Sequence, residues 1–369
     1  MHLFILDTKR SFGHFLERML AFVVLLLLFP YACNSFLQGS LLLGTRWARW
    51  TGRSLATPAR RLSSALNQEL TCNVNVFSNF DETPVSENQI VIGTHDGAFH
   101  CDEALAISLL RLMPQFASSC VLRSRNPEVL QVRTAEVRSI AEVIQLTPFD
   151  LFISQKCDVV VDVGGVYDST TYRYDHHQRS FTDTLDGFST KLSSAGLIYK
   201  HFGRVILENY MNTASDGLSR EEKNTMVDIC YHKLYRSFVE HIDAIDNGIT
   251  SAESEDIKCH MSTSLSARVG QLNPRWNQPQ NSNIQNEQFT KALALTRSEF
   301  LTNVDEVIHS WYPAKSLVQQ AVKKRFNTVD TDGQPIFASD GKIILLEQFC
   351  PWKDHLYEME QQVSLFIVM

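Results

Sequence analysis

The stretch QIVIGTHDGAFHCDEAL, residues 89–105, passes from a strand pattern through a polar loop into a helix pattern. QIVIG (89–93) is short, apolar and rich in β-branched residues, and it ends at glycine, which predicts a buried strand. The helix that we expect next places Leu105, Leu109 and Leu112 on one face. Asp102 stands where it can cap the first turn of that helix. A strand that leads directly into a helix is the start of a βαβ unit.

The same rhythm continues downstream. Residues 120–123 and 158–163 are further short apolar runs, so we expect an α/β fold with a mostly parallel sheet and flanking helices. The second half of the chain is expected to be helical, because apolar residues recur at helical spacing in 194–202, 204–211, 220–246, 286–310 and 315–326. Residues 335–338 and 342–347 are expected to form a β-hairpin around the Ser-Asp-Gly sequence at 339–341.

Three polar clusters stand where the predicted strands end. They are the loop His95–Asp102, the single residue Asp162, and the run Asp175–Arg179. In open α/β sheets, ligands bind outside the carboxyl ends of the strands, so all three clusters are expected to face one crevice. Imidazoles combined with carboxylates form a mixed ligand set that suits Mn²⁺, Fe²⁺, Co²⁺ or Zn²⁺ better than Ca²⁺. The sequence therefore indicates a metal site.

A fourth candidate lies at the end of the helix expected over 220–246. Asp243 and Asp246 are three residues apart, and a carboxylate in the last turn of a helix is poorly placed against the helix dipole. A nearby cation would remove that penalty, so either residue is a candidate ligand. Simpler interpretations exist for single residues: Asp102 alone is more typical of a cap, and His176 with His177 could form an exposed turn. A carboxylate that ends a buried strand, such as Asp162, needs a partner.

The charge of the chain is distributed unevenly. Residues 1–61 carry eight basic and two acidic groups, and the remainder carries 26 basic and 39 acidic groups, a net charge of −13 within an overall −7. Broad binding to the phosphate backbone needs a surplus of Lys and Arg, so an acidic body argues against it. It agrees with a protein that holds cations. The eight cysteines include no CxxC pair, which argues against a zinc knuckle or a disulfide framework.

Residues 1–67 are expected to be a targeting or leader segment, followed by a polar linker at 68–88. Residues 44–67 contain Arg with Ser, Thr and Ala and no acid until Glu69, which is typical of a mitochondrial transit peptide. The apolar run at 19–29 is too short to span a bilayer comfortably and resembles the core of a signal peptide. We favour mitochondrial import, with secretion or anchoring through 19–29 as alternatives, and expect no stable membrane span.

Several longer strings resemble a known family. The Asp175-His176-His177 triplet, the upstream His/Asp loop and a lone strand-end Asp are similar to the DHH phosphoesterase superfamily. The strings IGTHDGAFHCDEALA, VVDVGGVYD, YRYDHHQRSF, TKLSSAGLIY, DAIDNGI and CPWKDHLYEME resemble the melanocyte-proliferating-gene (MYG) family more closely. The resemblance runs from about 90 to about 365. It implies a metal-dependent 3′–5′ RNA exonuclease of the mitochondrial matrix and the nucleus.

The resemblance also implies a site with two divalent ions, Mn²⁺ or Mg²⁺. One ion would be held by His95 and His100, and the other by Asp102, His176 and either Asp246 or Asp243, with Asp162 between them. His177, beside Asp175, would touch the phosphate or act as a general acid. The predicted helix start around 191–196 offers hydroxyls, amides and a cation, so Lys191, Ser193 and Ser194 are candidates for substrate binding. Arg179 and Arg268 are further candidates, for which ordinary surface charge is an equal alternative.

The chain departs from the family pattern in two places. Residues 131–155 form an atypical insertion within an expected catalytic domain at 89–330. Residues 331–369 are expected to start a C-terminal substrate-binding domain that is cut short before a Gly-Gly-Gly-His-like motif. Three functions follow as hypotheses: an RNA exonuclease, a hydrolase of small phosphoesters or pyrophosphate that uses the same site, and a truncated inactive or scaffold form. The oligomeric state stays open.

Overall fold

The computed structural model describes residues 3–5, 74–81, 85–86, 89–131, 157–212, 218–249, 262–326, 341, 343–359 and 366–368. The chain divides into two compact units, one spanning 58–312 and the other formed by 313–369 together with 1–57. Apart from residues 3–5, the expected leader at 1–67 lies outside the described residues, as does nearly all of the insertion at 131–155.

A six-stranded sheet forms the centre of the 58–312 unit, and it confirms the expected α/β fold. Its strands lie in the order β2-β4-β3-β5-β7-β6, and every neighbouring pair is parallel except β6 with β7. The apolar strands β3, β4 and β5 are buried on both faces, as a sheet covered by helices requires. The strand bounds are β2 Val76–Phe77, β3 Val91–Thr94, β4 Cys120–Arg123, β5 Val159–Val161, β6 Tyr167–Asp168 and β7 Arg173–Tyr174.

Strand β2 corrects the expectation of a linker over all of 68–88. Val76 and Phe77 pair in parallel with β4 at the edge of the sheet, and Phe77 and Phe80 are buried in a small core. This stretch is polar and aperiodic in sequence because an edge strand of two residues leaves too few positions to show a period. The folded unit therefore begins before residue 89.

The chain reverses its direction of sheet growth at β3. From β3 it passes through helix α3 to β4 on one side, whereas β5 lies on the other side of β3. Such a reversal opens a crevice at the carboxyl ends of the two central strands, where α/β proteins bind ligands. The loop after β3 and the residue after β5 both enter this crevice.

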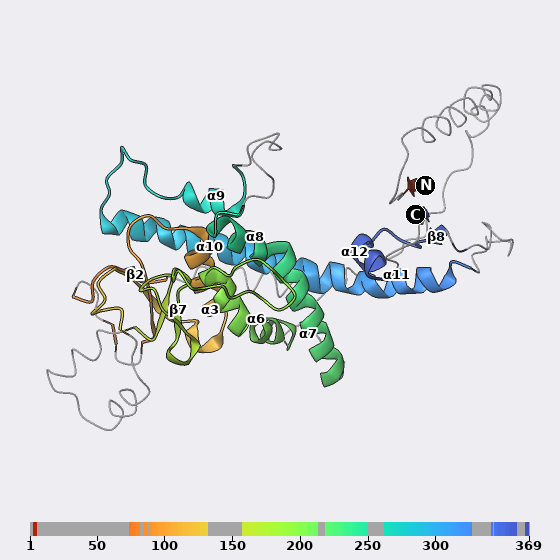
Figure 1. Ribbon diagram of the computed structural model, residues 1–369, viewed down its shortest axis with the longest axis horizontal. Coiled ribbons are helices and arrows are strands. Elements are labelled where there is room, and N and C mark those ends of the chain that lie inside the picture. The colour runs from red at the N-terminus through yellow and green to blue at the C-terminus, as the bar shows by residue number, and fades with distance from the viewer. Residues whose placement is uncertain are drawn as a thin grey trace, which may run out of the picture. The chain divides into compact units, whose positions relative to one another are not determined.

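The helices of this unit lie beside the sheet and pack on one another, with α3 against both α6 and α10 (Figure 1). Helix α6 is continuous where we predicted two segments. Gly203 lies within this helix, and glycine fits there because the rings of Tyr199 and Tyr231 occupy the space that a Cβ atom would take. The helix bounds are α3 Cys101–Leu110, α6 Ser194–Asn212, α7 Arg220–Leu234, the π turn η3 Tyr235–Val239, α8 Glu240–Asp246, α9 Leu265–Gly270, α10 Ser282–Glu306 and the π turn η4 Val307–Trp311.

The second unit contains most of helix α11 (Tyr312–Lys324), helix α12 (Lys353–Met359) and a three-stranded sheet of order β1-β9-β8. Strand β8 (Ile343–Leu345) falls within the range expected for the second hairpin strand, but its partner is β9 (Phe366–Val368), in parallel. The first expected hairpin strand, 335–338, lies outside the described residues. β1 (Leu3–Ile5) pairs antiparallel with β9.

In the part of the chain that the structure describes, no helix combines the length and the apolar character needed to cross a membrane.

Candidate metal centre

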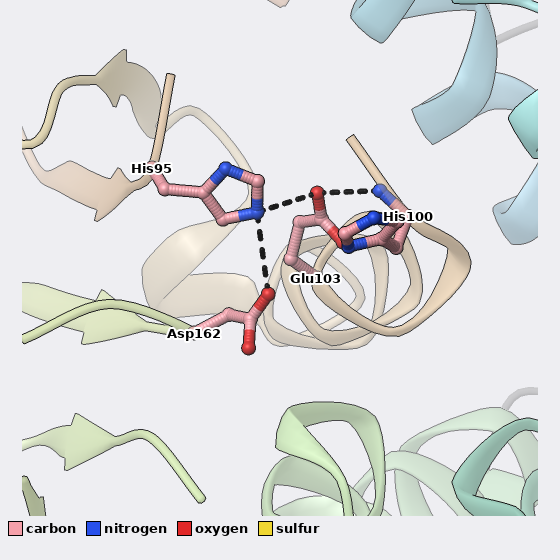
Figure 2. A group of neighbouring side chains, drawn as sticks. All are labelled: His95, His100, Glu103 and Asp162. Carbon is pink, nitrogen blue, oxygen red and sulfur yellow. Dashed lines mark hydrogen bonds and ion pairs between the residues drawn. The ribbon is translucent and has the colours of Figure 1, made fainter. Parts of the chain in front are cut away.

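His95, the first residue after β3, is buried and aims its Nε2 atom at two carboxylates. Nε2 lies 3.1 Å from Oε1 of Glu103 and 3.4 Å from Oδ2 of Asp162 (Figure 2). The other ring nitrogen, Nδ1, lies 2.9 Å from the carbonyl oxygen of Asp96. A neutral imidazole that donates from Nδ1 to this carbonyl presents an unprotonated Nε2, which is the atom that a metal ion would take.

Glu103 joins this group although the sequence analysis did not single it out. Its Oε1 accepts a hydrogen bond of 2.7 Å from the backbone N–H of His100, and its Oε2 is buried with no hydrogen-bond partner. The N-cap of α3 is His100, so the prediction that Asp102 caps the helix is wrong. Asp102 lies one residue inside the helix, and its side chain turns toward the crevice. The sequence did contain a signal for Glu103, because two acids, Asp102 and Glu103, follow His100 closely.

Asp162 follows β5 and lies at the centre of the site. Its φ of 56° is in the left-handed region, which aspartate tolerates better than most residues. Its Oδ1 accepts a hydrogen bond of 3.0 Å from Ser194 Oγ and lies 3.8 Å from His176 Nδ1 and 3.6 Å from His177 Nδ1. One carboxylate thus faces the histidines of both loops.

Asp175 and His177 form a tight pair beside it. Oδ1 of Asp175 lies 2.7 Å from His177 Nδ1 and accepts from the His177 backbone N–H at 3.0 Å, while Oδ2 accepts from Gly165 N–H at 2.6 Å. Burial favours the neutral acid, but these hydrogen bonds outweigh it and lower the pKa of Asp175. The same contact raises the pKa of His177, whose side chain is 61% exposed. Asp175 therefore orients His177 toward the open side of the site.

His176 points the other way, toward the end of α8. Its Nε2 lies 2.8 Å from Oδ2 of Asp246, and Asp102 lies close to both. Both carboxylate oxygens of Asp102 are buried and accept no hydrogen bond. Burial, followed by the charges of Asp162 and Glu103, raises the pKa of Asp102 well above its ordinary value. A buried carboxylate without donors is unstable as an anion unless a cation neutralises it.

Together these side chains form three linked groups whose candidate ligand atoms lie within 4.8 Å of one another. Asp162 belongs to the first two groups, and His176 belongs to the last two. The groups are His95, His100, Glu103 and Asp162; Asp162, Asp175, His176 and His177; and Asp102, His176 and Asp246.

This set of donors fits divalent cations. Without them, burial opposes the charged form of His95, but hydrogen bonds to Asp162 and Glu103 outweigh it and raise its pKa to about 10. Burial also raises the pKa of Asp162. The metal-free site thus takes up protons to offset its charge, and a metal ion would replace them. The structure brings together the side chains that the sequence analysis named as candidate ligands, apart from Asp243, and adds Glu103 to them.

Asp243 belongs to none of these groups. It is fully buried, and its Oδ1 accepts hydrogen bonds from Ser193 N–H (3.0 Å), Ser193 Oγ (2.6 Å) and Gly196 N–H (3.1 Å). Its Oδ2 accepts from the hydroxyl of Tyr235 at 2.8 Å. Burial raises the pKa of Asp243 to about 7, although these hydrogen bonds act to lower it. Of the two alternatives, Asp246 therefore belongs to a candidate ligand group, and Asp243 holds the start of α6.

The substrate-binding candidates do not all face the crevice. Ser193 and Ser194 are fully buried, and their hydroxyls are engaged by Asp243 and Asp162, so the expectation of free hydroxyls at this helix start is wrong. Arg268 forms a salt bridge of 2.7 Å with Glu299. Lys191 Nζ lies 5.4 Å from the centre of the Phe181 ring, and Arg179 is exposed.

Residues 91–145 and 146–369 match the sequence model of the MYG1 exonuclease family, described as uncharacterised protein family UPF0160. Among curated proteins, the chain is 42% identical over 279 residues to the MYG1 exonuclease of Mus musculus, 43% to that of Bos taurus and 42% to that of Homo sapiens. Each alignment covers 74% of this chain and 62–63% of the relative, so the chain spans less than two thirds of their length. No solved structure matches.

Proposed function

This chain belongs to the MYG1 exonuclease family, and we propose on that premise that it is a metal-dependent phosphoesterase. Within that class we propose a 3′–5′ RNA exonuclease that acts in mitochondria, the nucleus or both. The names of the mouse, bovine and human relatives support the nuclease class. The polarity, the RNA substrate and the location come from the wider resemblance of the sequence motifs.

The observation that carries the proposal is the buried, unpartnered carboxylate of Asp102 within three linked ligand groups. A site that was only structural would satisfy these oxygens with protein donors, as proteins do for most buried polar groups. Here donors are missing where His176, Asp246 and Asp162 converge. The arrangement therefore suits a metal ion with coordination positions left open for a substrate and for water.

We assign the residues as follows. His95, His100, Glu103 and Asp162 would hold one ion, and Asp102, His176 and Asp246 the other, with Asp162 able to serve both. Once bound, divalent ions would supply positive charge to the phosphoryl oxygens and lower the pKa of an attacking water. Glu103 and Asp96 fix the orientation of His95, and Ser194 fixes that of Asp162.

His177 is suited to move a proton. Its hydrogen bond to Asp175 holds the ring in place and favours the protonated form, while most of its surface remains exposed. A protonated imidazole in this position can donate to the leaving oxygen of a phosphodiester, as a general acid does. Asp175 acts through His177.

A small phosphoester or pyrophosphate is the second candidate substrate. The net charge of −13 outside residues 1–61 favours it, because an acidic surface repels a long polyanion. The location of the protein and any partner are open to the same experiments, and an inactive scaffold form would be indicated by a folded protein that binds no metal.

The test is hydrolysis of RNA carrying a 5′ label or a 3′ label, with Mn²⁺ or Mg²⁺, beside a panel of pyrophosphate and small phosphoesters. A 3′–5′ exonuclease releases a 3′ label at once as a mononucleotide and shortens the 5′-labelled RNA progressively. Preference for the small substrates would move the assignment to the second candidate. Undiminished activity after His176→Ala would contradict the metal-site mechanism.

A further inference from the structure

Two cavities adjoin the proposed metal centre and share a pair of histidines in their walls. The larger measures about 620 Å³ and the smaller about 280 Å³, and both are lined by His100 and His177. The larger cavity is within the range of roughly 300–1,000 Å³ that is usual for small-molecule pockets. A phosphoester centred on the metal ligands would extend into both cavities.

The larger cavity is charged at one end only. Asp102 and Asp246 stand at its metal end, whereas its remaining wall includes Ile242 and Ile245 from α8 and Ala267 from α9. Ile245 is 49% exposed, an unusual position for so apolar a side chain. The serines of α9 and its cap, Ser264 and Ser266, add neutral hydroxyls.

No lysine or arginine among the described residues lines this cavity. Arg268 lies on α9, but its guanidinium is paired with Glu299 at 2.7 Å. An apolar wall with neutral hydroxyls receives an uncharged, flat group far better than it receives a phosphate, because a buried anion needs a cation or several donors.

The smaller cavity is lined by ionisable groups of both signs, because the acids Asp162 and Asp175 stand there together with one arginine. It is lined by Arg125, with a side chain that is 63% exposed, and by the Gly164–Gly165 turn that follows β5. Arg125 is held at the rim by Asp96, whose Oδ1 lies 3.2 Å from its Nε. Although it is paired with Asp96, Arg125 is the one arginine or lysine among the described residues that lines either cavity, so phosphate is favoured on this side.

We infer that the larger cavity is a nucleoside pocket, which receives the sugar and base of the terminal nucleotide while the anionic remainder of the substrate lies toward Arg125. This inference rests on the proposed function and deepens it. It favours a nucleotide ester over pyrophosphate, because pyrophosphate has no uncharged portion to place against Ile242 and Ile245.

The test compares two neighbouring isoleucines of the full chain. Ile245→Asn removes an apolar wall of the cavity without adding charge near the metal ligands. Ile249→Asn is the matched control, since Ile249 is 48% exposed and does not line the cavity. Binding of AMP and of inorganic phosphate to the Mn²⁺-loaded proteins is measured by calorimetry, with the manganese content of each protein as a check.

Ile245→Asn is expected to weaken AMP binding about tenfold or more, as loss of apolar pocket contacts does, while phosphate binding and manganese content stay unchanged. Ile249→Asn should match the wild type in every measurement. Equal AMP affinity in both variants, or no AMP binding at all, would overturn the pocket assignment.

The failure of the two proposals can be told apart. If the wild type hydrolyses RNA and Ile245→Asn does so with unchanged KM, the pocket assignment fails and the phosphoesterase stands. If AMP binding depends on Ile245 but no phosphoester is hydrolysed, the proposed function fails and the pocket stands.

Discussion

Asp102 and Asp243 are both fully buried carboxylates, and they lie on helices α3 and α8, which pack together. Four hydrogen bonds reach the oxygens of Asp243, from Ser193, Gly196 and Tyr235. None reaches the oxygens of Asp102. Asp243 with its donors thus forms a hydrogen-bonded cluster, which we call the anchor. Asp102 belongs to a candidate ligand group, which we call the open group because its oxygens lack hydrogen-bond donors.

The difference separates two roles that the sequence pattern cannot tell apart. A carboxylate with donors around it stabilises the fold, because breaking such a cluster leaves several buried donors unpaired. A carboxylate without donors destabilises the fold until a cation binds. Variants of Asp243 should therefore mainly lower the stability of the fold, whereas variants of Asp102 should mainly impair metal binding and activity.

The largest effect is expected from Asp162→Asn. Asparagine tolerates the left-handed backbone at this position, so the fold should persist while both adjoining ligand groups lose the carboxylate that they share. Hydrolysis should fall by at least about a thousandfold, roughly 4 kcal/mol of barrier. Initial rates with Mn²⁺ measure it, and Asp186→Asn, at an exposed residue, is the control. Retention of more than a tenth of the activity would remove Asp162 from the mechanism.

The next effect distinguishes the anchor from the open group directly. Asp243→Ala should lower the free energy of unfolding by about 3 kcal/mol, because it leaves buried N–H and O–H donors at the start of α6 without an acceptor. Asp102→Asn in EDTA should leave the stability unchanged or increase it, since it removes a buried acid that lacks hydrogen-bond donors and must take up a proton when no cation is bound. Urea unfolding followed by circular dichroism measures both. A large loss in Asp102→Asn would mean that the structure itself depends on that carboxylate.

Metal addition should act on one region only. Mn²⁺ at a hundredfold excess over its dissociation constant should stabilise the wild type by about 2.7 kcal/mol per site. Asp243→Asn should keep this response, because its amide can still accept at one atom and donate to Tyr235 at the other. Asp102→Asn should lose at least part of it. Thermal melts over a manganese titration give the comparison, and equal shifts in all three proteins would contradict it.

The smallest effect tests the packing of the anchor. A Cβ at residue 196 would overlap the carboxylate of Asp243, so Gly196→Ala should cost about 1–3 kcal/mol of stability. Gly270→Ala in α9 has open space around its Cβ and should be neutral or slightly stabilising. Chemical unfolding measures both variants, and equal stabilities would show that the helix start moves without penalty.

The sheet and its ligand loops could be predicted because their signals are local. Strands β3, β4 and β5 are short, mostly apolar runs that end at or just before polar residues, and the switch in strand order then brings the loops together. The roles within α3 could not be predicted from spacing. Asp102 looks like a cap, and only the structure shows that the cap is His100, two residues earlier.

The roles of Asp243 and Asp246 depend on tertiary contacts. Both acids lie after the π turn η3, from which Tyr235 reaches Asp243, whereas Asp246 meets a histidine far away in the chain. A search for helical spacing does not detect a π turn, because its period differs from 3.6 residues. The hydroxyls of Ser193 and Ser194 were misassigned for a related reason: their acceptors come from α8 and β5.

The proposed ligands are drawn from segments that are distant along the chain, from His95 after β3 to Asp246 at the end of α8. During synthesis, domains generally fold from the N-terminal side as the chain emerges. A nascent chain that lacks α8 holds an incomplete ligand set, so ion capture has to wait until this helix docks. Metal binding by the proposed ligands would therefore report that α8 has docked on the rest of the unit.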